Sequence, residues 1–127
     1  MAISFKENTI IKEAKCSYEA HFGNSTVVRI VTDYDNIPIS FRISRHTDVS
    51  GFHVTALIQW LGVHNTDELV GKKIKVVLDA NDKIIGYGSP NADMFILVQD
   101  ERFNFYNWQE LVALDTPQNC HLMVRDF

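Results

Sequence analysis

The sequence contains little cysteine and little proline, and it has no excess of positive charge. Its two cysteines, Cys16 and Cys120, are far apart and lack the paired spacing of a zinc site. We expect reduced thiols buried in the core, with a disulfide between them as the alternative. The net charge of −4 argues against the broad cationic footprint that bulk nucleic-acid binding requires, although a local basic site stays open.

Long hydrophobic runs are also missing. No stretch approaches the roughly 20 consecutive apolar residues of a membrane-spanning helix. Residues 1–15 lack the apolar run and cleavage site of a signal peptide, so we expect a cytoplasmic protein, in the host cytoplasm if it is viral. The chain of 127 residues has no repeat, linker or low-complexity segment, which predicts a single domain over residues 1–127.

What is present is a pattern of β-strands around one helix. Alternating polarity and β-branched residues predict strands over residues 9–19, 26–32, 38–44, 73–79, 83–87, 94–98 and 120–124, with 103–106 as a further short candidate. A core-facing stripe predicts a helix over about residues 49–61, ended by Gly62; the stripe consists of Val54, Leu57, Ile58 and Leu61. Asn107 and Glu110 have the spacing of a capping box, which predicts a short second helix. The predicted fold class is α+β: an antiparallel, curled sheet of about seven strands packed on one main helix.

Charged and small residues gather where the strand over residues 38–44 gives way to the helix. They are Arg42, Arg45, His46, Ser50 and Gly51. Helix-start amides and arginine side chains suit a phosphate, and glycine permits close approach. This predicts an anion or nucleotide site, with Trp60 or Tyr87 stacking on the base. The alternative is a solvated helix start in which Asp48 satisfies the partial positive charge.

Aromatic residues outside the core stripe suggest a second kind of site. His53 and Trp60 lie on nearly one line of the helix, and the stretch VQDERFNFYNWQE places Tyr106 and Trp108 beside acidic residues. Such groups can anchor a protein interface, with His53, Tyr106 and Trp108 as the predicted contacts. The alternative for both groups is core packing, in which alternation turns Phe103 and Phe105 inward.

Catalytic and metal motifs do not stand out. The five histidines include no HExxH and no pair spaced four residues apart, so we predict no metal site. Nucleophile-elbow, kinase and Walker motifs are missing, and IGYGSP lacks the strand–helix context of a nucleotide fingerprint. We predict no cofactor and favour a protein that is not an enzyme. A small metal-free hydrolase or transferase, drawing on Asp79, Asp93 or His53, is the alternative.

Residues 61–95 carry a pattern of turns and alternation. Its features are Leu61, Gly62, Val63, Leu69, Gly71, Lys72, the strand over 74–77, the step over 85–88, and Phe95. This pattern resembles small proteins carried by bacteriophages and prophages. Ser89 and Met94 depart from it, because those proteins often have histidine and tryptophan at these places. The resemblance covers only part of the chain and implies a counter-defence role, either against host defence enzymes or against cyclic nucleotide immune signals.

These observations together predict a non-enzymatic binding protein. Its most concrete form is a phage-type counter-defence protein, such as an anti-CRISPR protein or an immune-signal sponge. It would sequester a nucleotide signal or block a host defence protein. A homo-oligomer is expected in the first case, because small pockets often form between subunits. A virion accessory protein is a further alternative.

Overall fold

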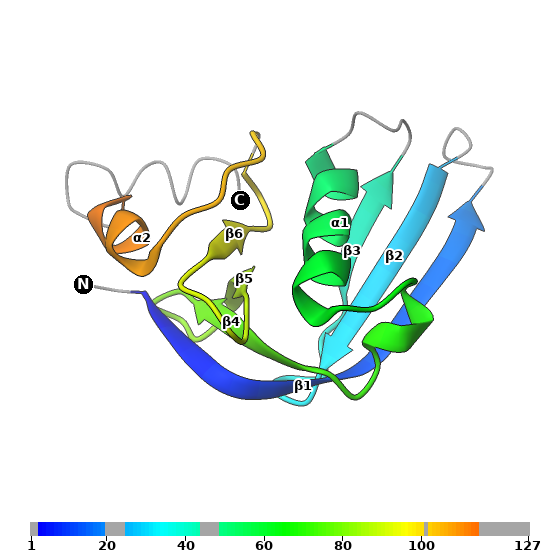
Figure 1. The fold of residues 1–127 in the computed structure, drawn as a ribbon, viewed down its shortest axis with the longest axis horizontal. Helices are drawn as coiled ribbons and strands as arrows, with labels where there is room; N and C mark the ends of the chain where they lie inside the picture. Colours follow the sequence, from blue (N-terminus) through cyan, green and yellow to red (C-terminus); the bar gives the residue numbers. More distant parts are fainter. Residues whose placement is uncertain (1–2, 20–24, 44–48, 101, 115–127) are drawn as a thin grey trace.

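The structure is a computed structural model that describes residues 3–19, 25–43, 49–100 and 102–114. The elements are β1 (Ser4–Glu19), β2 (Ser25–Thr32), β3 (Ile39–Ile43), α1 (Val49–Leu61), η2 (Asp67–Leu69), β4 (Lys73–Leu78), β5 (Ile84–Gly88), β6 (Phe95–Leu97) and α2 (Trp108–Leu114). The fold class is α+β, as predicted, and the described residues contain six strands rather than about seven (Figure 1). Neither described helix has the length and apolarity needed to span a bilayer.

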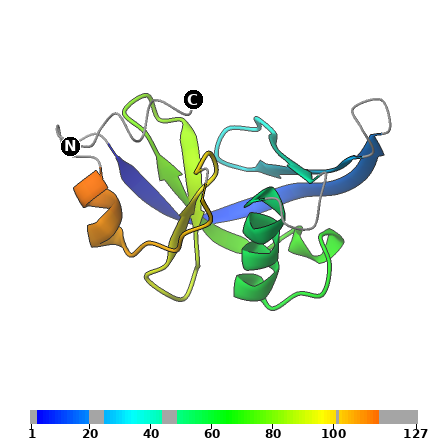
Figure 2. The ribbon, with the colours of Figure 1, turned by 90° about the horizontal axis from the view of Figure 1, so that it is seen from above.

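The strands form one antiparallel sheet in the order β3-β2-β1-β4-β5-β6. Strand β1 pairs with β4 through its first half and with β2 through its second half, so it joins the two halves of the sheet. Its pairing shifts register between Lys6 and Thr9, and again between Ile11 and Glu13. Such bulges bend a strand and increase its twist. Figures 1 and 2 show β1 curving, so that the sheet curls into a half-barrel.

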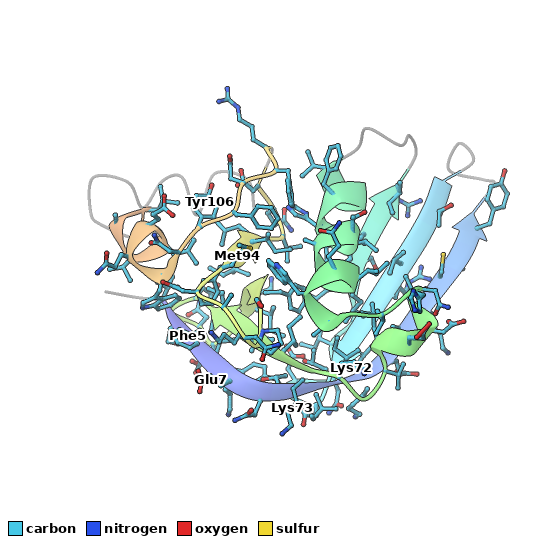
Figure 3. All side chains as sticks on the ribbon, in the orientation of Figure 1. Phe5, Glu7, Lys72, Lys73, Met94 and Tyr106 are labelled. Carbon is cyan, nitrogen blue, oxygen red and sulfur yellow. The ribbon has the colours of Figure 1, made fainter. Side chains whose placement is uncertain are left out.

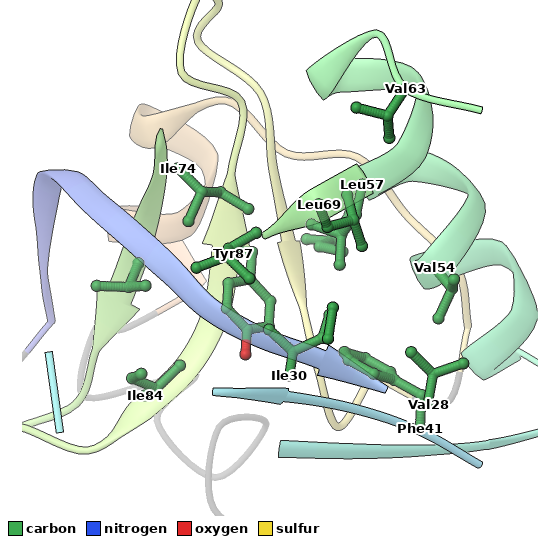
Figure 4. Close-up of a cluster of buried hydrophobic side chains, with 14 of the residues drawn as sticks. Val28, Ile30, Phe41, Val54, Leu57, Val63, Leu69, Ile74, Ile84 and Tyr87 are labelled. Carbon is green, nitrogen blue, oxygen red and sulfur yellow. The ribbon is translucent and has the colours of Figure 1, made fainter. Parts of the chain in front are cut away.

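Helix α1 packs inside this curl, against the face that carries the larger apolar cluster (Figure 4). Val54 and Leu57 are buried in the cluster, and Ile58 and Leu61 pack against it partly buried, which confirms the predicted stripe. Gly62 ends the helix with a φ of 65°. The amide of Gly62 donates to the carbonyl of residue 59 and the amide of residue 63 donates to that of residue 58, the two bonds of a Schellman motif.

The opposite face of the sheet carries a second apolar cluster, which α2 covers. Successive strand residues point to opposite faces, so Val76 belongs to the α1 cluster and Val77 to the second one. Helix α2 begins with the predicted capping box: the Asn107 amide donates to Glu110 Oε1 at 2.8 Å, and the Glu110 amide donates to Asn107 Oδ1 at 2.8 Å. The sheet is therefore buried from both sides in its β4–β6 half.

Two sequence-based expectations about the fold are wrong. Cys16 is exposed rather than buried, because it lies beyond Ala14, the last residue of β1 in the α1 cluster. Residues 103–106 form no strand; Tyr106 makes only a single bridge, in which its backbone exchanges two hydrogen bonds with Phe95. Cys120 and the strand predicted over residues 120–124 lie outside the described residues.

Candidate functional site

Ring side chains connect helix α1 to the segment that follows β6. We name this cluster the aromatic seam; it consists of Phe52, His53 and Trp60 from α1, with Phe103 and Phe105 from the segment. Ring centroids are 5.7 Å apart for Phe52 and Phe103, and 5.9 Å apart for Trp60 and Phe105. Phe103 and Phe105 meet edge to face at 4.7 Å and 78°. These separations are in the favourable range for aromatic pairs, so the seam fixes the segment against the helix.

His53 lies beneath the seam. It is 1% exposed and sits between Phe41, at 6.2 Å, and Phe103, at 5.5 Å. Neither ring nitrogen has a hydrogen-bond partner. Burial lowers the pKa of His53, with the charge of Asp100 acting in the opposite direction. His53 is thus a neutral packing residue. The expectation that it contacts a partner protein directly is corrected, because its ring is not accessible at the surface.

The outer side of the seam is exposed. Phe52 is 43% exposed and Phe105 is 45% exposed, and Phe103 lies between them. The exposed residues of α1 next in line are Thr55 and Gln59, and the whole helix VSGFHVTALIQWL contains no charged residue. A helix at a protein surface normally carries charges on its outward side. We name Phe52, Phe103 and Phe105 the outer seam.

Trp60 closes the inner end of the seam. Its indole N–H donates to Met94 Sδ at 3.3 Å, and the side chain is partly buried against the α1 cluster. Met94 and Tyr106 lie between α2 and α1 in Figure 3. Trp60 is therefore held by the protein's own side chains, and only part of its ring is accessible.

Tyr106 and Trp108 are both partly buried. The Tyr106 hydroxyl donates to Asp100 Oδ2 at 2.8 Å. Burial, together with this hydrogen bond, raises the pKa of Tyr106 to about 12. Trp108 packs against Phe5, with ring centroids 4.6 Å apart, in the second cluster. Both rings therefore act mainly as packing residues. Phe105, which the alternation of the sequence predicted to point inward, is exposed instead.

The described residues include only part of the predicted anion site. Arg42 alternates with Phe41 and Ile43 along β3, so it points to the sheet face opposite α1. Ser50 and Gly51 lie in the first turn of α1, half-buried. Arg45 and His46, like Asp48, lie outside the described residues.

Tyr87 was expected to stack on a nucleotide base, and this expectation is corrected. The residue is fully buried in the α1 cluster, with its ring 6.3 Å from that of Phe41 (Figure 4). Burial raises the pKa of its hydroxyl, with the charge of Asp35 adding to the effect. The hydroxyl has no hydrogen-bond partner. A ring enclosed on all sides cannot present a face to a ligand.

Metal-ligating residues do not converge in the part of the chain that the structure describes, since no three His, Cys, Asp or Glu side chains there could hold one ion. His21 and His121 lie outside that part. Comparison with protein families, with curated proteins and with solved structures gave no match. Function is therefore inferred from the geometry of the site.

Sequence reasoning missed Phe52 as a site residue. A helical projection places Phe52 on the side of the helix opposite the core stripe, so the signal of an exposed aromatic residue was present. What the projection lacks is the opposing segment: Phe103 and Phe105 lie about fifty positions further along the chain. Only the path of the chain after β6 brings them to α1.

Proposed function

We propose that this protein is a non-enzymatic binding protein that contacts another protein through the outer seam. The observation that carries the proposal is the pair of exposed rings, Phe52 and Phe105, joined through Phe103 beside a helix without charges. Interface centres are depleted in charge and enriched in aromatic residues. Exposed aromatic side chains that are already fixed in place lose little entropy on binding and often supply most of the binding energy.

A protein partner is better supported than a nucleotide. Tyr87 is buried, and Arg42 points away from the helix start. A nucleotide site at the helix start would depend on Arg45 and His46, which lie outside the described residues. The outer seam, in contrast, is built wholly from described side chains that contact one another.

The resemblance to small phage proteins supplies the partner's class in this proposal. The partner would be a host defence protein in the host cytoplasm, and the protein would act by covering part of its surface. The net charge of −4 would steer the approach toward a basic surface of that partner. The contact surface itself does not depend on this part of the proposal.

The test is capture from host lysate followed by quantitative binding of the recovered partner. Phe52→Ser and Phe105→Ser should each weaken binding at least about fivefold, because truncating a central aromatic residue costs more than about 1 kcal/mol. Tyr18→Ser and Ile37→Ser are matched controls, since these side chains are 64% and 59% exposed but lie outside the seam. Equal affinity of the seam variants and the controls would reject the outer seam as the contact surface.

A further inference from the structure

A group of cations lies on the face of the β1–β2–β3 sheet that points away from α1. Lys15 pairs directly with Arg29 across β1 and β2. Arg42 of β3 pairs with Val27, two residues along β2 from Arg29. Directly paired residues share a face, and so do residues two apart on one strand. Lys15, Arg29 and Arg42 therefore lie together, and we name them the basic face.

The basic face has an electrostatic cost for the sheet. Like charges directly opposite each other on neighbouring strands destabilise the pairing, and Lys15 opposite Arg29 is such a pair. The carboxylate of Glu13 lies 3.9 Å from Lys15 Nζ, but both side chains are more than half exposed, at 54% and 77%. Water and salt screen an exposed pair of this kind. Arg29 and Arg42 also interact with other groups of the protein. The feature that matters for ligand binding is therefore the spacing of the three cations.

We propose that the basic face binds a ligand that carries two or more linked phosphate groups. Neighbouring strands lie about 4.8 Å apart, and diagonal neighbours about 7–8 Å apart. One phosphate can therefore be reached from two strands, and a run of phosphates from all three cations. The guanidinium groups of Arg29 and Arg42 match phosphate oxygens with two parallel hydrogen bonds.

The neighbours of these cations favour recognition of phosphate rather than of a base. Ser40 pairs with Arg29, and Ser17 pairs with Val27 beside Arg42, so the two rows add hydroxyl donors and no aromatic ring. A ligand on these rows would be recognised by its charge. Its source is either a free oligophosphate, such as a nucleotide, or the backbone of a nucleic acid, since both present the same groups.

The experiment is titration calorimetry of the full chain with sodium tripolyphosphate at low and high salt. Arg29→Gln and Arg42→Gln should each raise the dissociation constant at least tenfold, and the affinity of the unmodified protein should fall as salt is added. Lys83→Gln is the control, because Lys83 is exposed in the β4–β5 turn and its loss changes the net charge equally. No binding by the unmodified protein, or equal weakening by Lys83→Gln, would overturn the proposal.

Two further variants keep the test independent of folding and of the proposed function. Arg29→Lys keeps the charge but loses the two parallel hydrogen bonds of the guanidinium group, so it should weaken binding less than Arg29→Gln does, and it provides the test if Arg29→Gln does not fold. Phe52→Ser lies in the outer seam and should bind tripolyphosphate normally, so each proposal can fail alone. A single-stranded oligonucleotide that competes more strongly than a nucleoside triphosphate would assign the source to nucleic acid, and the reverse order would assign it to a free nucleotide.

Discussion

Replacing His53 by leucine should stabilise the protein, and more strongly in mild acid. The His53 ring is 1% exposed with two ring nitrogens that lack partners. A buried polar group without a partner costs about 1–3 kcal/mol, whereas an apolar side chain of similar size avoids that cost. Leucine forgoes the ring contacts with Phe41 and Phe103, which are worth about 0.5–1.5 kcal/mol each. With two unpartnered nitrogens at about 2 kcal/mol each and two ring contacts at about 1 kcal/mol each, we expect a net gain of about 2 kcal/mol at neutral pH.

The pH dependence follows from the lowered pKa of His53. Burial keeps the imidazole neutral in the folded protein, whereas in the unfolded chain it takes up a proton near pH 6.5. The unfolded state thus binds more protons below that pH, so the stability linked to His53 is complete above about pH 6.5 and is lost as the pH falls. The slope of this loss reaches at most about 1.4 kcal/mol per pH unit for one proton. Leucine removes this contribution, so its advantage grows toward pH 5.5.

Urea unfolding followed by tryptophan fluorescence, at pH 7.5 and pH 5.5, measures both effects. His64→Leu is the control, because His64 is exposed. If His53→Leu shows the same pH dependence as the unmodified protein, His53 is not a buried neutral imidazole. A loss of more than about 2 kcal/mol at both pH values would mean that the ring nitrogens make hydrogen bonds in solution.

Two further predictions concern local contacts and are checked by denaturation. Tyr106→Phe removes the 2.8 Å hydrogen bond to Asp100 and should cost about 1.5–3 kcal/mol at pH 7. Because the pKa of Tyr106 is raised to about 12, the stability linked to its proton should be present below pH 10 and lost as the pH rises toward 12, and the phenylalanine variant should lack this loss. Gly86→Ala would drive a methyl group into the carbonyl oxygen of Ile96 and should cost about 1–3 kcal/mol. The control Gly51→Ala meets its nearest neighbour at an ordinary 3.7 Å and should stabilise α1 by about 0.5–1 kcal/mol; a loss as large as that of Gly86→Ala would contradict the packing argument.

Local features of the fold were predictable because they depend on residues close together in the chain. Helix α1 spans Val49–Leu61, as the spacing of its apolar residues and the glycine at position 62 indicated. The capping box joins Asn107 and Glu110, three residues apart, by two hydrogen bonds. Along β3, Phe41 is buried and Arg42 is exposed, which is the alternation expected of a strand with one buried face. Each of these features is set by backbone geometry and by side chains within one or two turns.

The candidate site was only partly predictable. Sequence spacing placed His53 and Trp60 on one side of α1, but it could not supply the rings that face them. The segment 102–106 reaches α1 because its backbone pairs with Phe95 at the edge of β6 and then continues into α2. Phe105 is exposed, although alternation predicted that it points inward, and His53 is buried, which is the core-packing alternative.

The sequence by itself determined the α+β class, the main helix with its core stripe, the C-terminal end of α1 and the N-terminal end of α2. Each of these follows from contacts over short stretches of chain. Only the tertiary structure decided which strands pair and in which register. Two register shifts in β1 change which of its residues share a face with those of β2 and β4. No local sequence pattern predicts these shifts. The pairing of Lys15 with Arg29, and the meeting of Phe52 with Phe103, depend on that register and on the curl of the sheet.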